Sequence, residues 1–213
     1  MKEQGTFSKK VGIMGGSFNP IHTGHLFMAQ RAMEDFCLDE VVFIPTGLQW
    51  MKKDDPDVLE GSIRLALTKE AVSDNPKFSV SDIEILRQGP TYTCETFAQL
   101  HESEPETEWF YIVGADTLAN MEKWKNPELV FSGAVILCAV RSGTEKEALL
   151  DLIGRLSEKF TADIRFLDLP RMDISSTDIR RRIKEGKSIR YMVPEKVRER
   201  IEKEGYYAER EMG

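Results

Sequence analysis

Short apolar runs alternate with longer amphipathic stretches along the chain. The run from Val11 to Met14 is apolar and partly β-branched, and from Thr23 to Phe36 the apolar residues return at helical spacing. A second apolar run, from Val41 to Ile44, ends at Pro45. Strand, helix and strand in this order are typical of a parallel, doubly wound α/β sheet.

The same alternation continues toward the C-terminus. Further strands are expected at residues 109–113, 134–140 and 164–167, and an extended segment at 78–86. Further helices are expected at residues 62–73 with Ser62 as cap, 93–101, 145–159, 175–184 with Ser175 or Ser176 as cap and Gly186 behind, and from Pro194 to Gly205.

No internal repeat or low-complexity linker interrupts this pattern. We therefore expect one Rossmann-like α/β domain over residues 1–213, with helices at its C-terminal end. Residues 1–10 are expected to form a disordered extension, and residues 51–61, rich in aspartate, a mobile loop.

Charge and cysteine usage narrow the class of protein. The 29 basic and 36 acidic residues give a net charge of −7, which argues against a nucleic-acid partner. A polar N-terminus and the lack of a long apolar stretch predict a cytoplasmic protein with no membrane partner. Cys37, Cys94 and Cys138 are odd in number and far apart, which argues against a disulfide framework or a zinc site, and Cys138 is expected in the core.

The first chemical motif lies where the first strand gives way to a helix. Gly15 and Gly16 allow a ligand close to the backbone, and His22 and His25 share one helix face. Together with the helix N-terminus, they suit a phosphate undergoing attack. A glycine pair is often only a turn, and a lone histidine is more often structural. The complete string of residues 16–25, GSFNPIHTGH, nevertheless favours the ligand-binding interpretation.

The second motif begins a C-terminal helix at residues 173–180, DISSTDIR. Hydroxyl groups at this position can simply cap the helix, and they can also hold phosphate oxygens. Arg180 lies one turn beyond Ser176 on the same face and can add a planar charged fork to the same anion.

Both motifs resemble those of the nucleotidyltransferase superfamily, G-x-F-x-P-x-H-x-x-H and I-S-S-T-x-I-R. The resemblance implies that the two histidines contact the ATP phosphates, and that serine, threonine and arginine hold the β- and γ-phosphates. Asp116, placed at the end of a strand, could bind ribose hydroxyls. The ATP site implied in this way comprises Gly15, Gly16, Ser17, Phe18, His22, His25, Gly114, Asp116, Ile174, Ser175, Ser176, Thr177 and Arg180.

The middle of the chain resembles bacterial nicotinate mononucleotide adenylyltransferases. Residues 87–93, RQGPTYT, are similar to their R-x-G-P-S-Y-T, residues 112–116 to their I-I-G-A-D, and Lys123-Trp124 to their K-W. Residues 141–143 are similar to their R-P-G, with Ser142 replacing proline. The resemblance implies transfer of AMP from ATP to nicotinate mononucleotide in NAD biosynthesis, with nicotinate adenine dinucleotide and pyrophosphate as products. The acceptor site implied comprises Asn19, Lys52, Thr91, Tyr92, Thr93, Trp124 and Arg141.

The chemistry of these groups agrees with that acceptor. The Trp124 indole offers a flat face for a pyridine ring, and the turn at Tyr92-Thr93 can present backbone N–H groups to a carboxylate. The chain departs from the family pattern after Pro45, where Met51 replaces a histidine and Lys52 takes the lysine position next to Lys53.

The expected reaction needs no general base, because an acceptor phosphate with a second pKa of about 6 is already a dianion. His22, His25, Lys52 and Arg180 would then stabilise charge, and Mg²⁺ is expected with ATP. Two alternatives remain, a sister transferase for phosphopantetheine, glycerol phosphate or nicotinamide mononucleotide, and a noncatalytic nucleotide-binding module. The chain is too short and too acidic for a fragment of an aminoacyl-tRNA synthetase. The oligomeric state is open, with a homo-oligomer among the alternatives.

Overall fold

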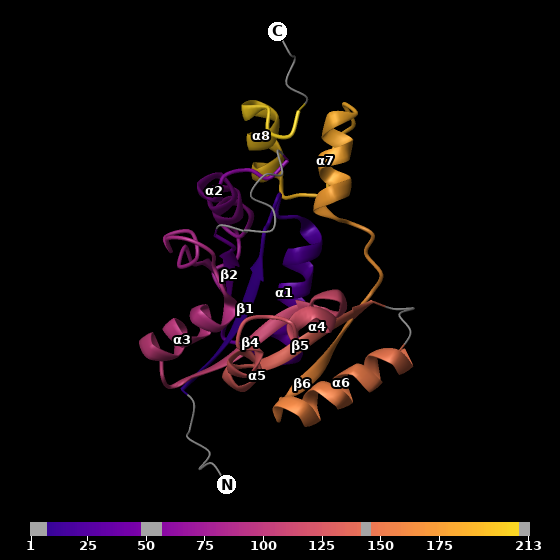
Figure 1. Cartoon of the computed structure of the whole chain (residues 1–213). Coiled ribbons are helices and arrows are strands. Elements are labelled where there is room, and N and C mark those ends of the chain that lie inside the picture. Colours follow the sequence, from indigo (N-terminus) through magenta and orange to yellow (C-terminus); the bar gives the residue numbers. More distant parts are fainter. Residues whose placement is uncertain (1–7, 48–56, 142–145, 209–213) are drawn as a thin grey trace. The chain divides into compact units, whose positions relative to one another are not determined.

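The structure is a computed structural model that describes residues 8–47, 57–141 and 146–208 (Figure 1). No helix in these ranges is long and apolar enough to cross a membrane. The elements follow one another as β1 (Lys9–Gly16), α1 (Thr23–Asp35), β2 (Glu40–Pro45), α2 (Gly61–Ala71), β3 (Phe78–Val80), α3 (Thr93–Ser103), β4 (Thr107–Gly114), α4 (Ala115–Met121), α5 (Pro127–Gly133), β5 (Val135–Arg141), α6 (Lys146–Phe160), β6 (Ile164–Leu169), α7 (Ser176–Lys184) and α8 (Glu195–Glu204).

The six strands form one sheet in the order β3-β2-β1-β4-β5-β6. From β1 to β6 neighbouring strands run parallel, with Val11 opposite Trp109, Phe110 opposite Val135, and Ile136 opposite Ile164. The strands β2 and β3 follow β1 on one side of it, whereas β4, β5 and β6 follow on the other side, so β1 and β4 flank the topological switch point. Ligands of such sheets bind at this point, beyond the carboxyl ends of the strands. The predicted doubly wound parallel α/β fold is therefore confirmed.

The chain forms two compact units. Of the described residues, the first contains 8–15, 28–42, 91–141 and 146–171, and the second contains 16–27, 43–47, 57–90 and 172–208. In the first unit, β4 and β5 supply fully buried side chains such as Ile112 and Leu137. In the second unit, Phe18 and Phe43 pack together, and α2 lies beside α8 (Figure 1). The number of domains stays a prediction.

Two expectations for secondary structure were wrong, and two short helices were missed. Ser62 does not cap α2, because the helix begins at Gly61, with Glu60 at the cap position and no side-chain hydrogen bond. The segment 78–86 is extended only as far as Val80, after which the chain turns and the Leu86 N–H donates to the Asp82 carbonyl. The two short helices α4 and α5 were not expected, since seven residues hold too little periodicity to be recognised.

The C-terminal helices begin and end where the sequence predicts. The Ser175 side chain accepts a hydrogen bond from the Asp178 N–H and so caps α7. Gly186, with φ of 65°, follows this helix, and Gly205 ends α8 with the same φ. Such positive φ values suit glycine, which has no Cβ to clash with the preceding turn.

All three cysteines are free thiols. Cys138 lies in β5 with no exposed surface, as predicted, and burial raises the pKa of its thiol to about 11. Cys94 is also buried, whereas Cys37 follows α1 and is exposed.

Candidate active site

The first motif forms a loop between β1 and α1 in the second unit. Phe18 anchors this loop, because its ring is 2% exposed and packs edge-on against His25 with ring centroids 5.1 Å apart. The Phe18 side chain therefore belongs to the core, and the predicted contact of Phe18 with ATP, which stays a prediction, would involve its backbone. Gly16 lies beside the same ring: a Cβ added to Gly16 would lie 3.2 Å from Phe18 Cε1, so a larger residue would press on the ring.

The two histidines form one stacked pair. Their ring centroids lie 3.7 Å apart, with an angle of 26° between the ring planes. The His22 backbone N–H donates to His25 Nδ1 over 3.2 Å, which assigns the proton of the neutral His25 ring to Nε2. Burial, and secondarily the neighbouring His22, hold the pKa of His25 well below its ordinary value. His25 is thus a neutral ring whose Nε2–H is a fixed hydrogen-bond donor.

Gly24 makes room for this pair. A Cβ added to Gly24 would lie 3.0 Å from His22 Nδ1 and 3.1 Å from His22 Cε1. Ordinary contact between such atoms begins near ~3.5 Å, so any side chain here would push the His22 ring. The glycine between the histidines in the motif is therefore a steric requirement of their arrangement.

The second motif binds directly to the first. Ser176 Oγ donates to the Pro20 carbonyl over 2.9 Å, and Arg180 Nη1 donates to the Asn19 carbonyl over 2.8 Å. Since the two acceptors are consecutive residues, Ser176 and Arg180 lie on the same face of α7, as predicted. Arg180 Nε is buried and has no hydrogen-bond partner among the described residues. A buried donor of this kind needs an acceptor, and a ligand anion could supply one.

The remaining residues of the second motif surround this contact. Ser175 uses its side-chain oxygen as the helix cap, whereas Thr177 is exposed. Ile174 is half-buried, and its carbonyl oxygen lies 4.0 Å from a Cβ added to Gly24. The start of α7 thus lies against the start of α1, and both expected phosphate motifs meet within the second unit.

Asn19 is the centre of a buried hydrogen-bond network. Its Nδ2 donates to the Asp57 carbonyl over 2.8 Å, and its Oδ1 accepts from the Leu59 N–H and from Tyr207 Oη. Burial raises the pKa of Tyr207 above its ordinary range, so its hydroxyl stays a donor. The Asn19 amide is therefore bonded within the protein, and contact between Asn19 and the acceptor stays a prediction.

Two residues of this region, Tyr207 and Arg64, were not predicted from the sequence. Arg64 is 3% exposed and donates to backbone carbonyls of three segments, at Ser17, Thr46 and Leu59. Its position was a usable signal, because Arg64, Leu67 and Ala71 recur at helical spacing and so place a charge on the buried face of α2. Nothing local marks Tyr207, which lies 188 residues from its partner Asn19.

Of the expected acceptor residues, Thr91, Tyr92, Thr93, Trp124 and Arg141 lie in the first unit, whereas Asn19 lies in the second. Tyr92 has an extended backbone, and its carbonyl accepts hydrogen bonds from the N–H groups of Glu95 and Thr96. The helix α3 therefore begins directly after Tyr92, as predicted, and its first-turn N–H groups lie next to this residue. The Lys125 ammonium lies 4.1 Å from the Tyr92 ring centroid and bonds to Glu95 over 2.8 Å. Thr91 and Thr93 flank this turn and are half-buried.

Trp124 is half-buried and meets the Tyr111 ring edge-on, with centroids 6.5 Å apart. Tyr111 also approaches the backbone of Gly15, where an added Cβ would lie 3.3 Å from its Oη. Part of the Trp124 surface remains accessible to solvent. The indole is therefore held by the protein while still offering surface to a ring.

The other expected site residues lie at the end of a strand, just beyond one, or outside the described ranges. Gly114 ends β4, and Asp116 does not end the strand as expected but lies exposed in the first turn of α4. Arg141 ends β5. Lys52 and Met51 lie outside the described residues, as does most of the loop expected at 51–61.

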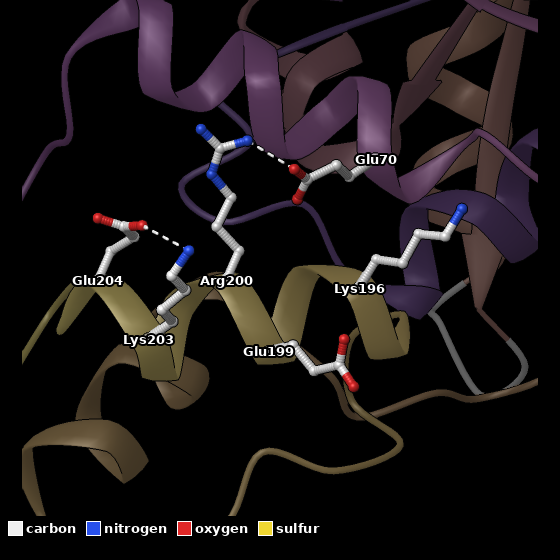
Figure 2. A pocket seen from close by; sticks show the side chains of 6 residues that line it. All are labelled: Glu70, Lys196, Glu199, Arg200, Lys203 and Glu204. Atoms are coloured by element: carbon white, nitrogen blue, oxygen red, sulfur yellow. Dashed lines mark hydrogen bonds and ion pairs between the residues drawn. The ribbon is translucent and has the colours of Figure 1, made fainter.

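A surface pocket of about 450 Å³ lies elsewhere in the second unit, between α2 and α8 (Figure 2). Three basic and three acidic side chains line it: Glu70, Lys196, Glu199, Arg200, Lys203 and Glu204. Figure 2 shows that four of these side chains form two ion pairs, Arg200 with Glu70 and Lys203 with Glu204. This balanced charge suits no phosphate, so the motif loops remain the candidate active site.

Comparison with known proteins agrees with this assignment. The profile of the cytidylyltransferase-like family matches residues 13–182. A protein of Lachnoclostridium phytofermentans named probable nicotinate-nucleotide adenylyltransferase is 44% identical over 199 residues, covering 93% of this chain and 99% of the relative. One of the same name from Clostridium novyi is 42% identical over 199 residues, with the same coverage.

Solved structures show the same fold. The nicotinic acid mononucleotide adenylyltransferase of Plasmodium falciparum, complexed with NaAD, superposes with a TM-score of 0.75 at 18% identity. The same protein complexed with APC gives a TM-score of 0.74. Each match covers 93% of this chain and 97% of the other.

Proposed function

Because this chain belongs to the cytidylyltransferase-like family and, within it, to the nicotinate-nucleotide adenylyltransferases, we propose that it transfers AMP from ATP to nicotinate mononucleotide. The products are nicotinate adenine dinucleotide and pyrophosphate, and the reaction is a step of NAD biosynthesis. The observation that carries the proposal is the bonding of Ser176 and Arg180 to the loop that leads into the His22–His25 pair.

The reaction is a direct displacement. An oxygen of the acceptor phosphate bonds to the α-phosphorus of ATP, and the bond from this phosphorus to the bridging oxygen of pyrophosphate breaks. The acceptor is already a dianion, so no side chain has to remove a proton. Positioning and charge stabilisation supply the rate enhancement.

The described residues divide this work. His25 Nε2–H donates to a phosphate oxygen as a neutral group, and His22 completes the stacked pair. Arg180, whose Nε is buried and unpartnered among the described residues, holds the leaving pyrophosphate together with the first turn of α7. The N–H groups at the start of α3 bind the nicotinate carboxylate, and Trp124 stacks on the pyridine ring.

Mg²⁺ is expected to be bound together with ATP. Among the described residues, no group of three His, Cys, Asp or Glu side chains is placed to hold a metal ion. The phosphates and water would therefore supply most of its ligands and partly neutralise the charge of the triphosphate. A cytoplasmic location stays a prediction from the sequence, and the oligomeric state stays open.

A panel of acceptors tests the proposal. Purified protein is incubated with ATP, Mg²⁺ and either nicotinate mononucleotide, nicotinamide mononucleotide, phosphopantetheine or glycerol 3-phosphate, and pyrophosphate release is measured. Nicotinate mononucleotide should give the highest kcat/KM, because the helix start and indole suit its carboxylate and ring. Equal or faster turnover of phosphopantetheine or glycerol 3-phosphate would contradict it, and ATP binding without turnover of any acceptor would favour a noncatalytic module.

A further inference from the structure

Arg64 of α2 is a buried cation that binds three separate backbone segments. Its Nη1 donates to the Ser17 carbonyl and its Nη2 to the Thr46 carbonyl, both over 2.7 Å. Nη2 also reaches the Gly47 carbonyl at 3.3 Å, and Nε donates to the Leu59 carbonyl over 2.9 Å. One rigid guanidinium therefore fixes the first phosphate motif, the end of β2 and the segment that enters α2.

The bond to Ser17 orients a peptide group of the phosphate motif. In a trans peptide, the carbonyl and the following N–H point in opposite directions. When Arg64 holds the Ser17 carbonyl, the Phe18 N–H consequently points away from Arg64. The same argument applies to the Thr46 carbonyl and the Gly47 N–H. Thr46 is itself tied to the motif, because its N–H donates to the Gly16 carbonyl over 2.9 Å.

Arg64 suits this task better than any other side chain. Only arginine offers several donors in a planar fork, and such a fork reaches several carbonyls at once. Burial lowers the pKa of Arg64 from its ordinary value, while Tyr207 and Glu84 raise it. The four carbonyl contacts compensate for removing a charge from water, which is expensive when a charge is left without partners.

We propose that Arg64 is a positioning residue for adenylyl transfer, which sets the orientation of backbone N–H groups in the first phosphate motif. Arg64 does not touch Ser176 or Arg180 in any contact described above, so the second motif should still bind ATP without it. Its loss should therefore lower the rate of the chemical step more than it lowers ATP affinity. This inference rests on the proposed function.

Two variants test it, Arg64→Lys, which keeps the charge, and Arg64→Met, which keeps much of the volume. In both, kcat with nicotinate mononucleotide should fall on the order of 10²-fold, the cost of a misplaced reacting group. ATP affinity, measured by calorimetry, should change less than about threefold. Both measurements are made at a temperature where circular dichroism shows the variant folded, and Arg200→Lys on α8 serves as the matched control with unchanged kcat.

Each other outcome overturns the inference. Wild-type kcat in a folded but less stable variant makes Arg64 a purely structural residue. Recovery of kcat in the lysine variant alone assigns the effect to charge instead of the fork, and failure of both variants to fold makes Arg64 a folding residue. The wild type is assayed first, so a wild type that does not use nicotinate mononucleotide contradicts the proposed function itself, and a normal wild type with a silent Arg64 contradicts only this inference.

Discussion

Replacing Gly24 by alanine should lower the activity of the protein and leave its stability nearly unchanged. The new Cβ would lie 3.0 Å from His22 Nδ1, so the ring has to move by about 0.5 Å to reach ordinary contact. It cannot move freely, because it stacks on His25 at 3.7 Å. Since a displacement of about 1 Å can cost on the order of 10²-fold in rate, half of that should lower kcat about tenfold.

The stability of the same variant should change little. Alanine favours a helix over glycine by about 1 kcal/mol in the interior, and this gain offsets part of the steric cost in the first turn of α1. Gly154 in α6 is the matched control, because an added Cβ there meets no described atom within 4 Å. Gly154→Ala should stabilise the protein by about 0.5–1 kcal/mol at unchanged kcat.

Steady-state kinetics by pyrophosphate release and urea unfolding followed by circular dichroism measure both quantities. Gly24→Ala should show the loss in kcat with an unfolding free energy within about 1 kcal/mol of the wild type. A variant with wild-type kcat and KM would refute the argument that His22 must keep its place. A variant that loses activity only in proportion to its unfolded fraction would refute it equally.

Three further expectations concern pH, the C-terminus and the lysine loop. Between pH 7.5 and 5.5, His25 should lower the unfolding free energy by up to about 1.4 kcal/mol, because the unfolded chain takes up a proton below pH ~6.5 that the folded ring does not. The unfolding free energy of His25→Gln should fall by that much less over the same range, and equal pH slopes of the two proteins in urea titrations would contradict the lowered pKa. Tyr207→Phe should lower the unfolding free energy, measured in urea, by about 1–2 kcal/mol, because a buried hydrogen bond is lost. Tyr191 is 84% exposed, so Tyr191→Phe should leave the unfolding free energy unchanged, and equal costs of the two variants would count against the buried bond. Lys52→Ala should weaken acceptor use in steady-state kinetics and leave the ATP affinity measured by calorimetry nearly unchanged, whereas Lys53→Ala should change neither quantity. If neither variant changes acceptor use, the expected contact of Lys52 is ruled out.

The fold could be predicted where periodicity is strong. The run Val11–Met14 and the helical spacing from Thr23 to Phe36 predicted β1 and α1, because a buried strand and an amphipathic helix impose different spacings on apolar residues. The same reasoning misplaced the start of α2 at Ser62, since a suitable capping residue does not fix where tertiary packing begins a helix.

The candidate site could be predicted only as far as local motifs extend. The strings containing His22 and Arg180 indicated two phosphate loops, and the structure joins them through backbone carbonyls of residues 19 and 20. The contacts that hold these loops come from Arg64 and Tyr207, and they depend on residues brought together by folding. Helical spacing indicates that Arg64 is buried, but no spacing in the sequence identifies which groups Arg64 or Tyr207 binds.

The three thiols differ in their exposure, so chemical labelling of the cysteines can report local opening of the protein. Cys37 is exposed, so an alkylating reagent should label it in the native state. Cys138 lies within β5, and its raised thiol pKa of about 11 leaves almost no thiolate at neutral pH. Slow labelling of Cys138, followed by mass spectrometry, would therefore time the rare fluctuations that expose β5, without any introduced probe.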